Sequence, residues 1–381
     1  MLPNWIWLVF IFAFGCCIGS FLNVVIYRVP RDESLVKPAS ACPACGRHIR
    51  FYDNIPLLSW LLLGRKCRYC KAPISPRYFV IELLTGSVFT ALFVLYFRVG
   101  LRAGIESFWW AGWFIYALHI TLLGALIAAS AIDLELWVIP LSICRLGAAA
   151  GIIGSTVGVL VIEPGCIRGY GLLPSASAST AALAAGAAIG LGVSWVLLVT
   201  GCIKRSYESN NDQKGPEKGE ESVGERQFNH RLEVCREILF LLPIVICSLA
   251  AYGTSFLIRD WWMHFSQLPA IAGLLGSMWG YFVGCGVVWV TRILGTLGFG
   301  KEAMGLGDVH LMGAAGAVIG PVLVVVAFFV APFFGLTWAG FQMLFKKIRQ
   351  IPYGPFLSLA VFAVMILHDR IFDYLNMIRY G

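Results

Sequence analysis

Two isolated carboxylates stand at the edges of apolar stretches in this sequence. Asp308 follows Met-Gly-Leu-Gly at 304–307, and residues 309–345 after it contain no Lys, Arg, Asp or Glu. Asp133 ends another apolar run. A carboxylate that reaches the centre of a bilayer costs roughly 2.5–3.5 kcal/mol on insertion scales, so it normally faces a cavity or a partner. Two aspartates at the membrane edge indicate an intramembrane aspartyl protease.

Two carboxylates brought close together cannot both ionise easily, so the pair is expected to share one proton. The ionised member takes a proton from water, which attacks the scissile carbonyl, and the protonated member donates to the developing oxyanion. The pair titrates as a unit, so acid and base are not assigned individually. This chemistry needs no metal. Gly305 and Gly307 lack Cβ atoms, so we expect them to shape a bend where an extended peptide comes close.

Each of these acidic residues also has a structural interpretation. An Asp ahead of an apolar helix is a favoured N-cap, and this is the alternative interpretation of Asp308. Asp133 alone is compatible with an ordinary polar residue at the inner face. We expect Glu82 to be a hydrogen-bonded residue at a helix end, and Lys301 and Glu302 to form a surface pair.

The elements that must position these residues are apolar runs of membrane-spanning length. The 381 residues are 59% hydrophobic and 13% charged, whereas a soluble domain carries about 25% charged residues, so the chain is a polytopic membrane protein. The runs cover 5–27, 78–97, 108–131, 141–162, 177–203, 237–258, 269–297, 309–345 (long enough for two) and 355–368. We therefore predict an all-α integral membrane protein with about ten transmembrane helices.

The distribution of basic residues orients these helices. Residues 28–77 hold ten Lys and Arg against three acidic residues, so this loop is predicted to be cytoplasmic. Alternation from there places 21 of the 29 basic residues in inner loops. It also puts Asp133 and Asp308 on the same, cytoplasmic side. Basic residues follow the first helix rather than precede it, so we predict an uncleaved anchor with its N-terminus outside.

The chain divides into five predicted segments. They are a first transmembrane helix (1–27), a cytoplasmic domain (28–77), helices carrying Asp133 (78–164), a helix pair with a polar loop at 204–236 (165–265), and a final transmembrane domain carrying Asp308 (266–381). The 204–236 loop has seven basic and seven acidic residues and few large apolar ones, so we predict disorder, with a regulatory tail as the alternative. Residues 176–192 are rich in Ala, Gly and Ser, which suits close helix packing in lipid.

Four cysteines in the cytoplasmic segment have the spacing of a metal site. Cys42 and Cys45 form one C-x2-C pair, and Cys67 and Cys70 form a second. Four thiolates in two such pairs match tetrahedral structural zinc and leave no open catalytic position. A loop of about 50 residues has too little core to fold alone, so the metal would supply folding energy. Reduced unliganded thiols or disulfides are the alternative.

Several blocks of the sequence together resemble one family, the type IV prepilin peptidases, which are presenilin-like GxGD aspartyl proteases. The blocks are 19–28 (GSFLNVVIYR), 53–61 (DNIPLLSWL), the two cysteine pairs, 74–78 (ISPRY), 82–86 (ELLTG), 132–133 with Pro140, 301–308 (KEAMGLGD) and 351–356 (IPYGPF). The resemblance implies that Asp133 and Asp308 are the catalytic pair.

Three departures from the family pattern affect these expectations. Leu141 stands where the family usually has Asp or Asn, so Asp133 is kept as the first catalytic residue and Glu135 as the fallback. The order Gly64-Arg65 differs from the family's Arg-Gly in a region associated with N-methyltransferase activity. The two aspartates are 175 positions apart, more than the family usually has, and 165–265 would account for the excess. His310 lies where many members carry Lys.

The resemblance implies removal of the short basic leader of type IV prepilins or type II secretion pseudopilins. Cleavage would follow a glycine at the cytoplasmic face of a bacterial inner membrane. The expected cofactor is structural zinc, joined by S-adenosylmethionine if the enzyme also methylates the new N-terminus. The expected partners are these substrates and the lipid bilayer, with no nucleic acid. The rival interpretations are a proton-relay transporter, since intramembrane carboxylates also mark proton pathways, and an inactive secretion scaffold.

Overall fold

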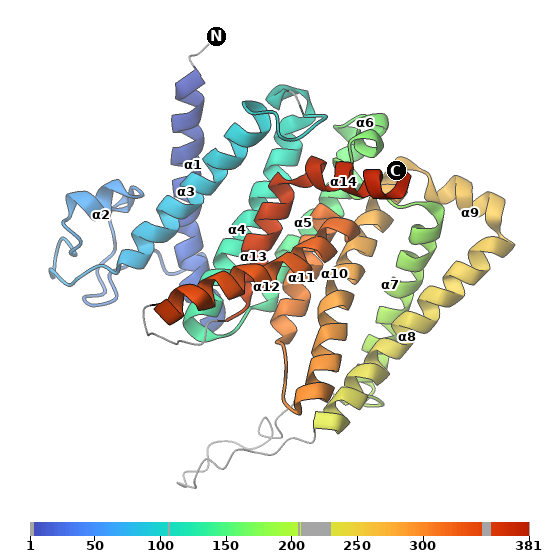
Figure 1. Ribbon diagram of the computed structural model, residues 1–381. Helices are drawn as coiled ribbons and strands as arrows, with labels where there is room; N and C mark the ends of the chain where they lie inside the picture. The colour runs from blue at the N-terminus through green and yellow to red at the C-terminus, as the bar shows by residue number, and fades with distance from the viewer. Residues whose placement is uncertain (1–3, 106, 205, 207–229, 345–351, 381) are drawn as a thin grey trace, which may run out of the picture.

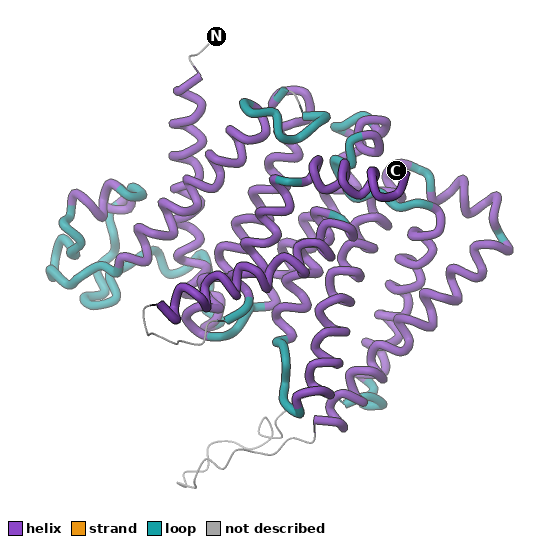
Figure 2. Tube along the Cα trace, in the orientation of Figure 1, coloured by secondary structure: helices purple, strands orange, loops and turns teal. Residues whose placement is uncertain are grey.

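The computed structural model describes residues 4–105, 107–204, 206, 230–344 and 352–380. This part of the chain is helical and contains no strand, and Figure 2 shows helices joined by loops. The prediction of an all-α protein is therefore confirmed. Most of the predicted 204–236 loop lies outside the described residues.

Ten helices of 13 residues or more correspond to the predicted apolar runs. They are α1 (Asn4–Arg28), α3 (Pro76–Phe97), α4 (Trp113–Leu136), α5 (Leu141–Val157), α7 (Ala178–Val199), α8 (His230–Leu257), α10 (Pro269–Phe299), α11 (Leu306–Ile319), α12 (Pro321–Leu344) and α13 (Gly354–Ile366). Shorter or peripheral elements are η1 (Val29–Arg31), η2 (Phe51–Asn54), α2 (Leu58–Leu62), η3 (Phe108–Gly112), η4 (Gly158–Leu160), α6 (Pro164–Gly169), α9 (Arg259–Ser266) and α14 (His368–Tyr380).

Eight of the described helices are long and apolar enough to span a membrane. The pair α13 and α14, bent by 74°, makes up to nine. The run 309–345 does form two helices, because Gly320, at a φ of +88°, breaks it, but α11 has only 14 residues. The chain is thus a multi-pass membrane protein with close to the predicted number of helices.

The helix boundary that differs most from the prediction is the start of α8. Helix α8 begins at His230, so residues 230–236 form its first turns rather than the end of a loop. The sequence pattern missed these turns because they are charged. The structure buries two acidic residues on one face of this part of the helix, Glu233 and Glu237, which are 5% and 4% exposed.

The helix ends that carry the candidate catalytic residues gather at one end of the bundle. In Figure 1 the end of α4 and the starts of α11 and α13 lie on the lower side, as do the start of α3 and the end of α10. Helices α6, α9 and α14 lie on the opposite, upper side. The hydroxyl of Ser130 on α4 donates a hydrogen bond of 2.8 Å to the hydroxyl of Ser358 on α13, which fixes these two helices side by side.

Glycines let the helix backbones approach closely. A Cβ on Gly280 of α10 would collide with the carbonyl of Gly316 on α11, and the reverse also holds. On α7, Gly186 and Gly190 lie against the backbone of α8. The close packing predicted for residues 176–192 is therefore confirmed. Small residues at helix contacts are the usual way in which membrane helices associate.

Replacing Gly280 by Ala should destabilise the bundle, because the new methyl group has no room between α10 and α11. We expect a loss of about 1–3 kcal/mol, the usual cost of overpacking. The matched control is Gly286→Ala on the same helix, where no atom lies within 4 Å of the position that the new methyl group would take. It should leave stability unchanged or raise it by up to about 1 kcal/mol through helix propensity. Thermal unfolding in detergent measures both, and equal effects would contradict the packing account.

Candidate active site

Asp133 lies in the last turns of α4 and is buried, with 6% of its surface exposed. Its Oδ2 accepts a hydrogen bond of 3.1 Å from the backbone amide of Gly354, the first residue of α13. A Cβ on Gly354 would lie 2.5 Å from that oxygen, so any other residue there would push against the carboxylate. The start of α13 therefore holds Asp133 from across the bundle, 221 positions along the chain.

Asp308 lies in the first turn of α11 and is 8% exposed. Gly305 is the N-cap residue of this helix, and the Gly305 backbone interacts with the Asp308 carboxylate. The Oδ1 atom is buried and has no hydrogen-bond partner among the described residues. An unpartnered buried carboxylate oxygen is costly, and such groups are found at catalytic or ligand-binding positions. The interpretation of Asp308 as the helix N-cap is therefore wrong, because Gly305 is the N-cap and Asp308 is the third residue of the helix.

The two aspartates belong to one polar site. The charge of Asp133 acts electrostatically on Asp308, so the carboxylates are close in space despite the long separation in sequence. Ile139, in the connection between α4 and α5, packs against the backbone beside both of them. A Cβ on Gly307 would lie 2.7 Å from the Cβ of Ile139, and one on Gly354 would lie 3.2 Å from its Cδ1.

Gly305 and Gly307 therefore differ from each other. The missing Cβ of Gly307 makes room for Ile139, which is a packing role and leaves no gap for a peptide on that side. The nearest atom to a Cβ on Gly305 would be Oδ2 of Asp308, at an ordinary contact distance of 3.5 Å. No bend within α11 is present at these residues, because Gly305 is the N-cap and Gly307 is already helical.

A cavity of about 410 Å³ lies in the bundle and reaches α11 at His310. It lies between α5, α7 and α10, and His310, two residues after Asp308, contributes to its lining. The Nδ1 atom of His310 is 3.2 Å from the hydroxyl of Tyr281. Cys144, also in the lining, is near enough to Asp308 for an electrostatic interaction. Neither Asp133 nor Asp308 is among the residues that line this cavity.

The other acidic candidates have partners elsewhere. Glu135, the fallback for Asp133, forms an ion pair of 2.7 Å with Arg77 at the start of α3. Glu82 accepts a hydrogen bond of 2.8 Å from the backbone amide of Leu57, as predicted for a hydrogen-bonded residue near a helix end. Glu302 pairs with Arg292 at 2.6 Å, so its predicted surface pairing with Lys301 is wrong.

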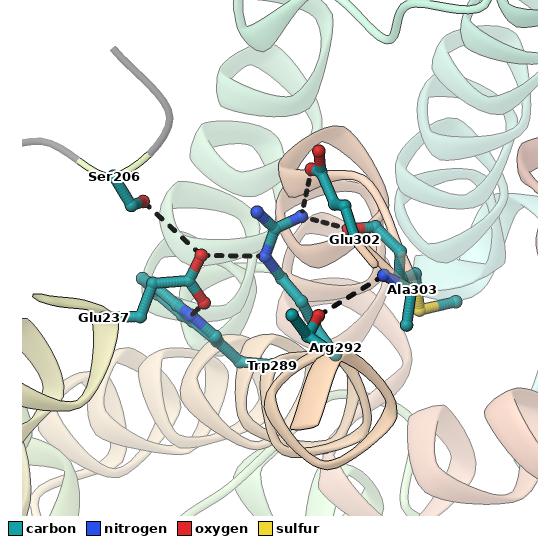
Figure 3. A network of polar contacts seen from close by, with 8 residues as sticks. Ser206, Glu237, Trp289, Arg292, Glu302 and Ala303 are labelled. Carbon is teal, nitrogen blue, oxygen red and sulfur yellow. Dashed lines mark hydrogen bonds and ion pairs between the residues drawn. The ribbon is translucent and has the colours of Figure 1, made fainter. Parts of the chain in front are cut away.

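A buried ion network next to the site was not predicted from the sequence. Arg292 of α10 is 1% exposed and contacts Glu237 of α8 as well as Glu302 (Figure 3). The available signal was that an arginine inside an apolar run needs a partner. The partner itself was hidden, because Glu237 lies 55 positions away.

The four cysteines Cys42, Cys45, Cys67 and Cys70 form one cluster. Their Sγ atoms all lie within 4.8 Å of one another. Each pair lies in the same kind of tight turn, since Cys42 and Cys67 each donate their backbone amide back across the turn, at 2.9 Å and 2.8 Å. The turns close at Gly46 and Lys71, both with positive φ. This donor set fits tetrahedral metal coordination.

The cysteine cluster is tied to the rest of the 28–77 segment and to α3. Asp53 accepts hydrogen bonds from Arg68, at 2.6 Å for the shortest, and this guanidinium holds the pKa of the Asp53 carboxyl below its usual value. Trp60 stacks on Phe79 of α3 with ring centroids 4.8 Å apart. The segment therefore packs against the membrane helices rather than hanging free from them.

Comparisons with known proteins give two family matches. Residues 13–96 match the bacterial peptidase A24 N-terminal domain, and residues 238–340 match the type IV leader peptidase family. The second match contains Asp308 and begins inside the segment 165–265, whereas Asp133 lies between the two matched ranges. No solved structure matches the chain.

Curated relatives agree with these matches. The chain is 46% identical over 144 residues to a prepilin leader peptidase/N-methyltransferase of Myxococcus xanthus, which covers 38% of this chain and 39% of that protein. It is 43% identical over 142 residues to the type 4 prepilin-like proteins leader peptide-processing enzyme of Escherichia coli, covering 32% and 46%. It is 31% identical over 198 residues to the prepilin leader peptidase/N-methyltransferase of Burkholderia pseudomallei, covering 44% and 60%. The matches thus span about two to three fifths of these relatives' lengths.

Replacing Asp308 by Asn should stabilise the fold, because it removes one of two neighbouring buried carboxylates. We expect a gain of about 1 kcal/mol, typical of relieving a strained functional site. Thermal unfolding of the purified protein measures this. Asp369→Asn is the control, since Asp369 accepts a hydrogen bond from the Ala103 amide and lies 3.9 Å from Arg102, and its loss should lower stability. A clear loss of stability on Asp308→Asn would indicate a structural role instead.

Proposed function

Because the chain belongs to the type IV leader peptidase family, we propose that it is a membrane-embedded aspartyl endopeptidase with Asp133 and Asp308 as its catalytic pair. The substrates are type IV prepilins or type II secretion pseudopilins, and the bond cut follows a glycine at the end of their short basic leader. The observation that carries this proposal is the convergence of two buried aspartates from α4 and α11, with Ile139 packed against the backbone beside both of them.

The mechanism is hydrolysis of a peptide bond by a proton-sharing pair. One carboxylate removes a proton from water, and the water oxygen bonds to the scissile carbonyl carbon. The other, protonated carboxylate donates its proton to the carbonyl oxygen as the tetrahedral intermediate forms. Collapse of that intermediate breaks the C–N bond: the leaving amine takes the proton that the first carboxylate removed from water, and one hydroxyl of the intermediate returns a proton to the second carboxylate. The roles of the two residues belong to the pair rather than to either alone.

The remaining site residues orient the two carboxylates and make room for the substrate peptide. The amide of Gly354 donates to Asp133, so it orients that carboxylate and occupies one of its oxygens. Oδ1 of Asp308 is left for water or substrate. Gly305, whose side-chain position is open except for Asp308, is where an extended peptide comes closest to the pair. Gly307 supports this arrangement by admitting Ile139.

We propose that the protein lies in the bacterial inner membrane with its N-terminus outside and the aspartates at the cytoplasmic face. The distribution of basic residues supports this orientation, because 21 of 29 fall in loops on the side of Asp133 and Asp308. The 28–77 segment is then cytoplasmic. In this arrangement the basic leader of a substrate reaches the site from the side on which it is made.

The cysteine cluster is proposed to bind one structural zinc ion. Cys42, Cys45, Cys67 and Cys70 supply four thiolates, which fill a tetrahedral site and leave no position for catalysis. The ion would stabilise the fold of the 28–77 segment. It takes no part in peptide hydrolysis.

N-methylation of the new N-terminus is a second candidate function. It is favoured by the names of relatives such as that of Myxococcus xanthus. The methyl donor would be S-adenosylmethionine. We assign no residues to it.

The peptidase proposal is tested by incubating a prepilin with the purified protein in lipid nanodiscs, followed by mass spectrometry of the new N-terminus. Asp133→Asn and Asp308→Asn should each lower the rate by about 10²–10⁴-fold, the usual contribution of a general acid or base. Glu135→Gln should cut at nearly the wild-type rate, since Glu135 is exposed and paired with Arg77. The same spectra report any added methyl group.

Three results would change this assignment. Equal cutting by wild type and both asparagine variants would make the aspartates structural. Loss of cutting in Glu135→Gln alone would move the first catalytic role to that residue. Failure of the wild type to cut any of several prepilins would favour an inactive scaffold or a proton-relay transporter.

Zinc content is checked by elemental analysis of the purified protein. We expect about one zinc per chain in the wild type and almost none in a Cys42→Ser, Cys67→Ser variant, because two of four ligands are gone. Removing the metal with a chelator should make residues 28–77 sensitive to protease while the membrane helices stay intact. Cys144→Ser, a cysteine outside the cluster, serves as the control. A full zinc complement in the double variant would contradict the site.

A further inference from the structure

Arg292 is the most deeply buried charged side chain in the described part of the chain, with 1% of its surface exposed. Its Nε donates to Oε1 of Glu237 at 2.9 Å, and its Nη1 donates to Oε1 of Glu302 at 2.6 Å. The same Nη1 also donates to the backbone carbonyl of Met304. Figure 3 shows the guanidinium between Glu237 on one side and the Glu302–Ala303 segment on the other. One side chain thus joins α8, α10 and the connection that precedes α11.

The Glu237 side of this network is itself fixed. Oε2 of Glu237 accepts a hydrogen bond of 3.0 Å from the indole of Trp289, about one turn before Arg292 on α10. The Trp289 ring stacks on Phe240 of α8 with centroids 5.7 Å apart. Ser206 donates to Oε1 of Glu237 at 3.4 Å. Both carboxylate oxygens of Glu237 therefore have partners, and the guanidinium it pairs with has little freedom to move.

The other side of the network leads directly to the proposed catalytic pair. Helix α10 ends at Phe299, with Gly300 in the left-handed region. The amide of Ala303 donates to Thr296 at 3.3 Å, and Met304 is held by Arg292. The next residue is Gly305, the N-cap of the helix that carries Asp308 in its first turn. The charge of Arg292 also acts on Asp308 itself.

We propose that Arg292 and Glu237 are positioning residues that hold the 302–305 connection and thereby the carboxylate of Asp308 in the geometry of the pair. This inference rests on the proposed peptidase function. It assigns α8 a role in the active site although none of its described residues carries a catalytic group.

The physical reason is that the Arg292 guanidinium binds three partners at once, namely the carboxylates of Glu237 and Glu302 and the carbonyl of Met304. Its planar fork matches two carboxylates and one carbonyl, which a lysine ammonium does not reproduce. A buried charge that loses its partner also loses its fixed position, because the pair is held by mutual attraction in a region of low dielectric. Moving a reacting group by about 1 Å can lower the rate about 100-fold. Loss of Glu237 should therefore affect turnover even where the fold survives.

The test compares Glu237→Gln and Arg292→Lys with wild type and with Asp369→Asn as the matched control. Asp369 lies in α14, at the opposite end of the bundle in Figure 1, and its neighbour is also a buried arginine, Arg102. Two measurements are made on each protein in nanodiscs. One is the steady-state cleavage of a prepilin, giving kcat and KM separately. The other is hydrogen–deuterium exchange of the amides in 300–306, which needs no substrate.

We expect Glu237→Gln to lower kcat by about 10- to 100-fold while KM changes less than about threefold, because the transition state rather than substrate binding is affected. Arg292→Lys should retain part of the activity. Both variants should exchange faster at 300–306, whereas Asp369→Asn should match wild type in kcat and in exchange at that segment. The double variant Glu237→Gln, Arg292→Lys should be little slower than the worse single variant, as expected for residues acting as one unit.

The proposal is overturned if Glu237→Gln is folded and keeps the wild-type kcat, or if exchange at 300–306 is unchanged in both variants. A lowered unfolding temperature with unchanged kcat would make the network purely structural and also overturns it. If the wild type itself does not cut, the peptidase assignment fails. The exchange measurement then still decides whether Glu237 and Arg292 hold the connection.

Discussion

Charged groups inside this bundle exist where a specific partner compensates their removal from water, and this requirement determines much of the arrangement around the site. The amide of Gly354 satisfies Asp133, and two carboxylates and a carbonyl surround Arg292. These partners come from helices far apart in the chain. Because a hydrogen bond forms only when donor and acceptor are about 3 Å apart, the ends of α4, α10, α11 and α13 have to meet at one end of the molecule. The Oδ1 atom of Asp308 has no such partner among the described residues.

Close helix contacts are the means by which these ends are brought together. The Asp133 carboxylate lies so close to Gly354 that a Cβ there would have no room, and Ile139 lies similarly close to Gly307. Farther from the site, Gly280 and Gly316 let α10 and α11 touch along their backbones. Since α10 also carries Arg292, the same helix both packs against α11 and holds the connection before it. The same helix thus provides both the packing against α11 and the side chain that positions the start of α11.

The cysteine cluster and most of the helices could be predicted from the sequence, because their signals are local. The paired cysteines have a spacing that brings four thiols together, and the run 309–345 was long enough to be two helices. Contacts between distant elements could not be predicted in this way. In a membrane both buried and lipid-facing surfaces are apolar, so periodicity does not say which helices touch, and nothing in the local pattern pairs Glu237 with Arg292. The contact of Gly307 with Ile139 could not be predicted for the same reason, since Ile139 comes from another helix connection.

The most direct test of the central claim is a structure of the protein bound to a prepilin peptide whose scissile amide is replaced by a hydroxyethylene group. Such a group imitates the tetrahedral intermediate and binds where the acid–base pair acts. We predict that its hydroxyl lies within hydrogen-bonding distance of both Asp133 and Asp308, with the peptide backbone passing Gly305. A hydroxyl bound away from either aspartate, in a complex that still competes with substrate, would contradict the assignment of these two residues as the catalytic pair.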